Sequence, residues 1–423
     1  MRFIHTADWH LGNQMHGIDR TAEVRAFLRW LRAQIEDFQA EALVIAGDVF
    51  DSANPSVEAR RQYYTFLASL SGTCCCNVVV IGGNHDSAAL LDAAKELLGV
   101  LGINVVGSVS NLAPEDMCFE LRGAGGAARA VCLAVPFVRE IELRNLLAVK
   151  PQSDRDLLGQ AHRALYSAVH AAAEKMRAGR NIPLVATGHL FAADLDGRLA
   201  HVPSGERTDD GVRSLDVLGT LGRVPSSVFP AVDYVALGHV HYASMVGRNP
   251  AVRYSGSPFV MGFDEAGIPH HVLCVAAEAG CVPAVEKRET PRTFVYRRVS
   301  GTMQEVRADL ERCALACHDD ARPVFLELRY RREIGVSARD YFAAALERLP
   351  DAVSVVSWSA MEHESALAET GGGFEAAEIM NLDDAEVFTR LILTREGLSP
   401  DSDEARAVLE KYLPLFLKAG AEF

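Results

Sequence analysis

Five short apolar runs in this sequence end in the same way, and this recurrence constrains the fold more than any other feature. Each run is rich in aliphatic or β-branched residues, breaks into glycine or another small residue, and then reaches Asp, Asn or His. One such ending would be an ordinary turn, because Gly, Asn and Asp tolerate left-handed backbone angles. Five repetitions indicate a common structural cause. The segments are RFIHTADWHLG (2–12), ALVIAGDVFD (42–51), NVVVIGGNHD (77–86), PLVATGHLF (183–191) and DYVALGHVHYA (233–243).

Runs without polar alternation are typical of strands buried on both faces. The stretches between them are amphipathic and predict helices that pack outside the strands, over residues 23–38, 57–70, 88–98 and 157–176. This pattern indicates a layered α/β fold. In such folds the ligand site lies beyond the carboxyl ends of the strands. We therefore expect the five polar ends to converge.

The converging side chains would form a metal centre. Carboxylate, amide and imidazole donors together suit manganese, iron or zinc better than calcium. A two-metal site needs one bridging carboxylate and about three further ligands for each metal, which uses seven of the eight candidates. Any other histidine is interpreted as structural. The candidates are Asp8, His10, Asp48, Asn84, His85, His189, His239 and His241.

Composition limits the class of protein. With 423 residues, of which 49% are hydrophobic, the chain can form two or three domains. No apolar run approaches the roughly 18 residues of a membrane span, and no leader precedes the first strand, so we expect a cytoplasmic protein. Nine cysteines, three of them adjacent at 74–76, favour reduced thiols over a disulfide framework. Cys313, Cys317 and His318 are interpreted as a helix face rather than a zinc site.

The net charge of −14 argues against a general binder of polyanions. Residues 287–332 differ from the rest, with 11 Lys or Arg and 7 Asp or Glu. This segment can face a polyanion, although a solvated surface of mixed charge explains the count equally well.

The motifs DWH, GDVFD, GNHD, GHL and GHVH, in this order, resemble the signature of the calcineurin-like metallophosphoesterases. HTADWHLG, YSGSP (254–258) and the layout of the whole chain further resemble the SbcD family, the nuclease subunits of bacterial SbcCD complexes. The resemblance implies a central β-sandwich flanked by helices, and a DNA exonuclease and endonuclease acting in repair and recombination. A phosphoesterase of small phosphodiesters or phosphoproteins, and a non-catalytic scaffold, are the alternatives.

The resemblance also implies roles for the candidate residues. Asp48 would bridge two metals, most consistent with manganese. His85 would stabilise the transition state and donate a proton to the leaving 3′ oxygen, with the Asp51 carboxylate as its orienting partner. The remaining ligands divide into Asp8, His10 and His241 for one metal, and Asn84, His189 and His239 for the other.

We expect four regions along the chain. Residues 1–276 would form the nuclease domain, and 277–362 a small α+β accessory domain of order β-α-β-α-β that caps the site and selects DNA. Residues 363–375 are expected to form a glycine-rich linker, and 376–423 two capped helices with apolar faces.

The expected partners follow from the same resemblance. The tail at 376–423 would dock on an SbcC-type ATPase, unless it packs back on its own domain. The chain has no G-x-x-x-x-G-K-[ST] loop, so any dependence on ATP must come from that partner. A homodimer within a heterotetramer is expected, paired through the helices near 57–70 and 88–98.

Overall fold

The computed structural model describes most of the first 361 residues. The described ranges are 1–146, 154–193, 224–316, 322–333 and 336–361, together with isolated positions between 389 and 412. The predicted linker at 363–375 lies outside the described residues, and so does the tail at 376–423 apart from those isolated positions. No helix in the described ranges is both long enough and apolar enough to span a membrane.

A six-stranded sheet carries the first three polar strand ends. Its strand order is β14-β13-β1-β2-β3-β4. The four strands from β1 to β4 are parallel, and β13 and β14 add antiparallel to one side. The bounds are β1 Arg2–Thr6, β2 Ala42–Ala46, β3 Asn77–Ile81, β4 Ile103–Val106, β13 His271–Ala276 and β14 Ala284–Glu289.

A second six-stranded sheet carries the other two strand ends, in the order β11-β12-β10-β7-β6-β5. Its four central strands are parallel and its two edge strands are antiparallel. The glycine-rich loop at 123–126 joins β5 to β6 as a hairpin. The bounds are β5 Cys118–Arg122, β6 Ala128–Leu133, β7 Leu184–His189, β10 Tyr234–Gly238, β11 Ser244–Met245 and β12 Val252–Tyr254.

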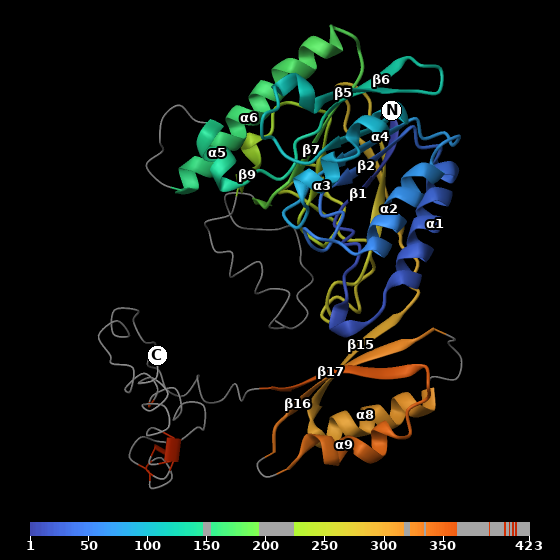
Figure 1. Ribbon diagram of the computed structural model, residues 1–423, viewed down its shortest axis with the longest axis vertical. Helices are drawn as coiled ribbons and strands as arrows, with labels where there is room; N and C mark the ends of the chain where they lie inside the picture. Colours follow the sequence, from blue (N-terminus) through green and yellow to red (C-terminus); the bar gives the residue numbers. More distant parts are fainter. Residues whose placement is uncertain are drawn as a thin grey trace. The chain divides into compact units, whose positions relative to one another are not determined.

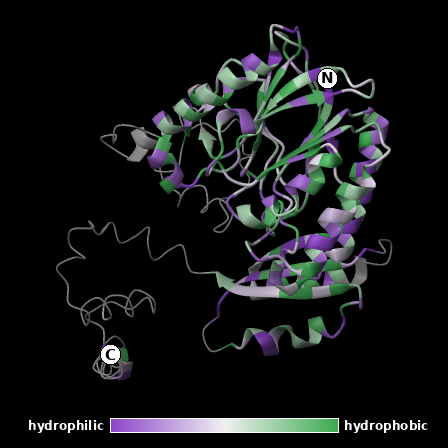
Figure 2. Ribbon diagram, turned by 45° about the horizontal axis from the view of Figure 1, so that its top comes forward, coloured by the Kyte–Doolittle hydropathy of each residue, from purple (hydrophilic) through white to green (hydrophobic). Residues whose placement is uncertain are grey.

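The strands β1, β2 and β3 of the first sheet are buried on both faces, as the unbroken apolar runs predict. Along β2, Val44 packs in the core that joins the two sheets, whereas Leu43 and Ile45 pack in the core beneath the outer helices. Figure 2 shows the central strands of the sandwich mostly in the hydrophobic colour and the outer helices in mixed colours. The two sheets therefore form a central sandwich, and the predicted fold class is confirmed.

Helices cover both outer faces of the sandwich (Figure 1). The helices α1 (Thr21–Phe38) and α2 (Val57–Ser69) pack on the first sheet, and α6 (Asp154–Arg177) packs on the second. The helix predicted over 88–98 is instead two short helices, α3 (Ala88–Asp92) and α4 (Lys95–Val100). The interruption follows Asp92, whose carboxylate accepts a hydrogen bond from the Gly107 main chain. Shorter elements are η1 Met15–Gly17, η2 Pro114–Met117, α5 Glu140–Leu146, β8 Ala192–Ala193, β9 Val224–Pro225 and η4 Ser226–Val228.

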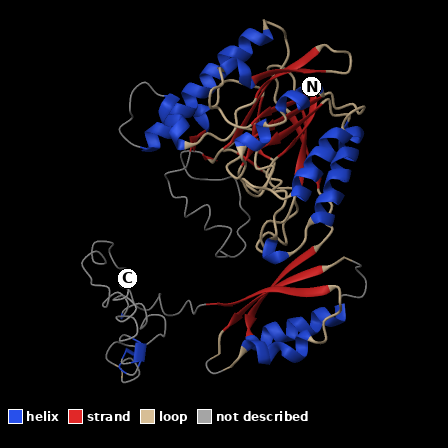
Figure 3. Cartoon of the chain, in the orientation of Figure 1, coloured by secondary structure: helices blue, strands red, loops and turns tan. Residues whose placement is uncertain are grey.

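The predicted β-α-β-α-β order is confirmed and includes a three-stranded sheet, β15-β16-β17 (Figure 3). The elements are β15 Val295–Thr302, α8 Met303–Ala316, β16 Val324–Arg331, α9 Ala338–Leu346 and β17 Val353–Met361.

The boundary predicted at residue 276 does not coincide with the limits of the compact units. The strand β14 pairs with β13 in the first sheet, and Phe294 and Tyr296 pack with Phe263 in one apolar cluster. Among the described residues, the first compact unit lies within 1–299, 309–328 and 345–358, and the second includes 300–308, 329–344 and 359–361.

The YSGSP motif fixes the segment that follows β7. The buried Tyr254 hydroxyl accepts a hydrogen bond from the Ala192 main-chain N–H (2.7 Å) and donates one to the Leu190 carbonyl (2.9 Å). Both main-chain groups lose this partner if the hydroxyl is removed.

We predict that Tyr254→Phe lowers the free energy of unfolding by about 1–3 kcal/mol, since the freed groups stay buried. Urea unfolding measures the change. Tyr64→Phe is the control, because the Tyr64 hydroxyl makes no hydrogen bond among the described residues, and equal stability of the two variants would contradict the prediction.

Candidate metal centre

The polar ends of all five strands meet, as the sequence predicts. Two carboxylates follow strands of the first sheet, Asp8 after β1 and Asp48 after β2. Asn84 and His85 follow β3. The second sheet contributes His189 at the end of β7 and the His-x-His pair 239 and 241 after β10.

Three overlapping groups of these side chains could each hold a metal ion. In each group the ligand atoms lie within 4.8 Å of one another. Asp8, His10 and Asp48 are each shared between two groups, so the groups form one continuous cluster. The groups are Asp8, His10 and His241; His10, Asp48 and His85; and Asp8, Asp48 and His189.

Asn84 joins His239, the remaining histidine, to the cluster. Its Oδ1 lies 3.0 Å from Nε2 of His189 and 3.0 Å from Nδ1 of His239. Nε2 of His189 lies 3.2 Å from Oδ2 of Asp48. All eight candidates thus belong to one constellation.

The centre has a buried floor and an exposed rim. Asp8, His10, Asp48 and His189 are buried, whereas Asn84 and His85 are exposed. A substrate can therefore approach from the side of Asn84 and His85.

The loops that carry the ligands adopt an unusual backbone. Asp8, His10, Asp48 and His239 have φ of 54°, 43°, 48° and 97°. Such angles cost roughly 1–3 kcal/mol each for residues other than glycine, and they persist only where surrounding contacts enforce them. Glycine is also required at residue 83, because a Cβ there would collide with the Asp48 carboxylate.

Hydrogen bonds between loops supply that enforcement. The main-chain N–H of Asp8 donates to the Gly47 carbonyl, and that of His10 donates to the Asp48 carbonyl, each at 3.0 Å. Asp86 is the residue that sequence reasoning missed. Its buried carboxylate accepts hydrogen bonds from the main-chain N–H groups of Val49, Phe50 and Gly83. Its position inside the GNHD motif was the available signal.

Asp51 contacts His85 differently from the prediction. Nδ1 of His85 donates to the main-chain carbonyl of Asp51 (3.0 Å), not to its carboxylate. The carboxylate instead accepts from Asn13 and lies 3.4 Å from Nδ1 of His10. Asp51 thus supports two site histidines through two different groups.

Comparison with known proteins agrees with this geometry. The calcineurin-like phosphoesterase family matches residues 1–243. The chain is similar to the SbcD subunit of the SbcCD nuclease of Escherichia coli K12, at 32% identity over 94% of each chain. It is also similar to the SbcD proteins of Rhodobacter capsulatus, at 36% identity over 83% of this chain and 85% of the relative, and Bacillus subtilis, at 33% over 66% and 67%. The chain belongs to the SbcD family of calcineurin-like phosphoesterases.

Divalent metals, which this family name implies, fit the residues present. Among the described residues, both ring nitrogens of His10 are buried without a hydrogen-bond partner, an arrangement that is costly unless a ligand completes it. The donors combine carboxylate, amide and imidazole, as transition metals prefer. The tautomer of His189 also favours metal binding, because its Nδ1 donates to the Ala46 carbonyl (2.9 Å) and leaves Nε2 facing the cluster.

Protons compete with metal ions for the same candidate ligand atoms. Burial raises the pKa of Asp8 to about 6. Burial also disfavours ionisation of Asp48, but the charge of His189 outweighs this effect and holds the pKa of Asp48 below its usual range. Burial lowers the pKa of His189, yet the charges of Asp48 and Asp8 dominate and raise it to about 9. In the metal-free protein, the His189 ring therefore carries a proton on both nitrogens at neutral pH.

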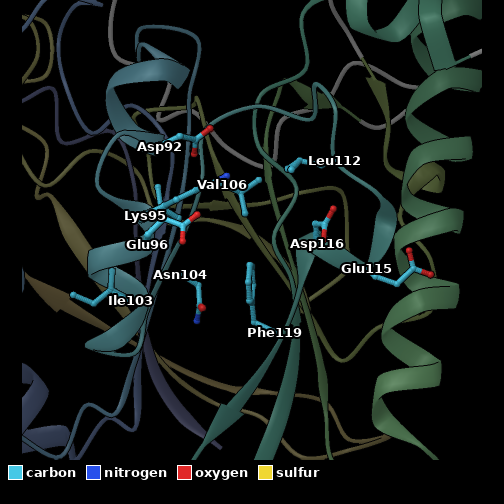
Figure 4. Close-up of a pocket in the computed structure, with 12 residues that line it drawn as sticks. Asp92, Lys95, Glu96, Ile103, Asn104, Val106, Leu112, Glu115, Asp116 and Phe119 are labelled. Carbon is cyan, nitrogen blue, oxygen red and sulfur yellow. The ribbon is translucent and has the colours of Figure 1, made fainter.

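A cavity of about 590 Å³ lies between α4 and β4 on one side and β5 on the other (Figure 4). Asp92, Glu96, Glu115 and Asp116 contribute carboxylates, and Phe119 lines it as well. None of the predicted site residues lines this cavity.

We predict that metal binding releases about one proton from His189 at pH 7.5, because a ligating imidazole must be neutral. Apparent metal affinity should rise about tenfold per pH unit between pH 7 and 8.5 and level off above about pH 9. Calorimetric titration with Mn²⁺ in two buffers of different ionisation enthalpy measures the release. Identical apparent enthalpies in both buffers would contradict this assignment.

Proposed function

We propose that this chain is the nuclease subunit of a DNA end-processing complex, cutting DNA phosphodiesters with two divalent metals. Its substrates would be duplex ends and hairpin or single-stranded DNA, and its location the cytoplasm. The observation that carries the proposal is the convergence of seven candidate metal ligands and His85 from five strand ends, in a chain whose relatives are named as the SbcD component of the SbcCD nuclease. Intact carboxylates at Asp8 and Asp48 argue against a non-catalytic scaffold.

The residues would divide into two ligand sets. Asp8, His10 and His241, which form one group of nearby donors, would hold one metal, and Asp48, which belongs to the two other groups, would serve both metals. The second set is made by Asn84 with His189 and His239, which both contact its amide oxygen. Bound cations would supply Lewis acidity, activating water and offsetting the charge that develops on the phosphoryl group.

His85 is proposed as the proton donor to the leaving 3′ oxygen. It lies on the exposed rim, and its main-chain N–H donates to Oδ1 of Asp48 (2.9 Å). Because its Nδ1 is bonded to the Asp51 carbonyl, its Nε2 is the nitrogen available to a substrate. The hydrogen bond to the Asp51 carbonyl also orients the imidazole ring of His85. The His10 ring packs edge-on against it, with 4.9 Å between the two ring centroids.

Manganese is the proposed metal. Four imidazoles among the ligands favour a transition metal over magnesium, which prefers oxygen donors and retains its waters. An enzyme of small phosphodiesters would share all these ligands. Cleavage of hairpin and linear DNA with Mn²⁺, compared with a small chromogenic phosphodiester, separates the two functions.

The wider assembly is part of the proposal. Within the predicted segment 277–362, the part from β15 to β17 (295–361) would form the DNA-facing accessory domain, because β14 belongs to the first sheet. Residues 363–375 would form the linker, and 376–423 the module that binds an SbcC-type ATPase. The names of the relatives support a complex, since each is called a subunit. ATP dependence would enter through that partner.

A homodimer would form through the outer helices of the first sheet. Val57 at the start of α2 and Leu97 and Val100 on α4 are 73%, 71% and 83% exposed. Apolar side chains so exposed on helices that pack on the same core favour an interface. This face agrees with the pairing that the family resemblance implies.

We predict that His85→Gln abolishes cleavage of hairpin DNA with Mn²⁺ and leaves two metals bound per chain, because His85 acts on the leaving group. Asp48→Asn should lose both cleavage and metal, since it serves both ligand sets. Metal content is measured by atomic emission after gel filtration. A metal-free His85→Gln would show that His85 is a ligand, as its place near His10 and Asp48 also allows.

We predict that Leu97→Asp combined with Val100→Asp converts a dimer into a monomer, because charge on this face opposes its burial. Light scattering after gel filtration gives the mass. Ile141→Asp on α5, where the side chain is 64% exposed, is the matched control and should remain dimeric. Dimers of unchanged mass in the double variant would exclude this interface.

A further inference from the structure

Glu265 is a buried carboxylate that neither the ligand set nor the apolar core explains. It is 5% exposed and lies in the turn after Gly262, whose carbonyl accepts its main-chain N–H. Within the described ranges its Oε2 accepts one hydrogen bond, from the Met261 main chain (2.8 Å). Arg20, a buried guanidinium, pairs with Glu23 instead. A buried carboxylate with so few partners is costly, so its surroundings point to a further role.

Two histidines lie on either side of this carboxylate. Nδ1 of His241 is 3.9 Å from Oε1 of Glu265, and Nε2 of His270 is 3.8 Å from Oε2. Both distances are longer than those of hydrogen bonds. Nε2 of His270 is buried and has no hydrogen-bond partner in the described part of the chain, so no described group competes for it.

The backbone couples the same residues. Nδ1 of His270 donates to the Ser257 carbonyl (2.9 Å), and the Ser257 N–H donates to the His241 carbonyl (3.0 Å). His241 is therefore held through its main chain by the YSGSP loop, and its ring faces the Glu265 carboxylate. A metal-ligating histidine usually donates its second ring N–H to a carboxylate or carbonyl, which fixes its tautomer and orientation.

We propose that Glu265 is a positioning residue for His241, accepting its Nδ1–H so that Nε2 faces the metal. This inference rests on the proposed role of His241 as a ligand. It places a carboxylate behind His241 in the way that the Asp51 carboxylate lies behind His10. Each of these two histidines thus has an acidic residue of its own on the side of Nδ1.

The test is Mn²⁺ binding to the full chain, measured by calorimetry. Glu265→Gln keeps the shape and the acceptor for Met261 but removes the charge. We expect one of the two sites to weaken by about 10–100-fold and the other to remain near wild type. The thermal midpoint of the metal-free protein should not fall, because a neutral amide is easier to bury than a carboxylate. Glu327→Gln, which removes another buried carboxylate paired with Arg298, should leave both sites unchanged.

A double variant distinguishes positioning from general damage. If Glu265 acts through His241, adding Glu265→Gln to His241→Ala should not weaken binding beyond His241→Ala alone. The proposal would be overturned if the losses of Mn²⁺ affinity in the two variants were additive, or if both sites of Glu265→Gln bound Mn²⁺ as in wild type. In either case the proposed function would stand, provided that wild type binds two metals and cuts DNA. A wild-type chain that binds no Mn²⁺ would instead refute the proposed function.

One further measurement uses the wild-type chain and does not depend on whether a Glu265 variant folds. In the wild-type chain loaded with Zn²⁺, nitrogen-15 spectra of the histidine rings should show His241 protonated at Nδ1, with its signals assigned by their loss in His241→Gln. Protonation at Nε2 in the loaded protein would overturn the proposal, because Glu265 would then face an unprotonated nitrogen.

Discussion

The burial of two carboxylates side by side is the constraint on which the rest of this site depends. Asp8 is fully buried and Asp48 is 2% exposed, and their oxygens belong to one ligand group with His189. Like charges in a low-dielectric interior repel strongly, so the arrangement requires compensating positive charge or hydrogen bonds. The protonated His189 supplies part of this compensation. The His239 N–H, which donates to Asp8, and the His85 N–H, which donates to Asp48, supply more. Divalent cations would replace the proton and serve the same electrostatic need.

The sequence could predict the floor of the site because the fold determines it. Apolar runs that are buried on both faces must be central strands, and strands of one direction bring their carboxyl ends together. Asp8, Asp48 and His189 follow directly from this rule. The same reasoning predicts the helices at 23–38 and 57–70 to within two residues of α1 and α2, because their apolar spacing is set by packing on the sheet.

Contacts between distant segments could not be predicted in this way. The Asp51 side chain faces His10 rather than His85 because the loop after β2 is held by Asp86, a residue of another strand end. The break between α3 and α4 comes directly after Asp92, whose carboxylate accepts a hydrogen bond from the Gly107 N–H. Glu265 reaches His241 from a turn further along the chain. None of these pairs carries a periodic signal, because each depends on how separate elements pack.

The two sheets approach each other closely at the site itself. The candidate ligands from the first sheet and from the second lie within a few ångströms of one another, whereas packed sheets usually stand about 10 Å apart. Small residues at the strand ends reconcile these distances. A Cβ at Gly238 would collide with the Ala46 carbonyl and crowd Ala7, and one at Gly47 would collide with the ring of His189. The small residue before the ligand is therefore a requirement of the sandwich as much as of the turn. This is why the motif recurs on strands of both sheets.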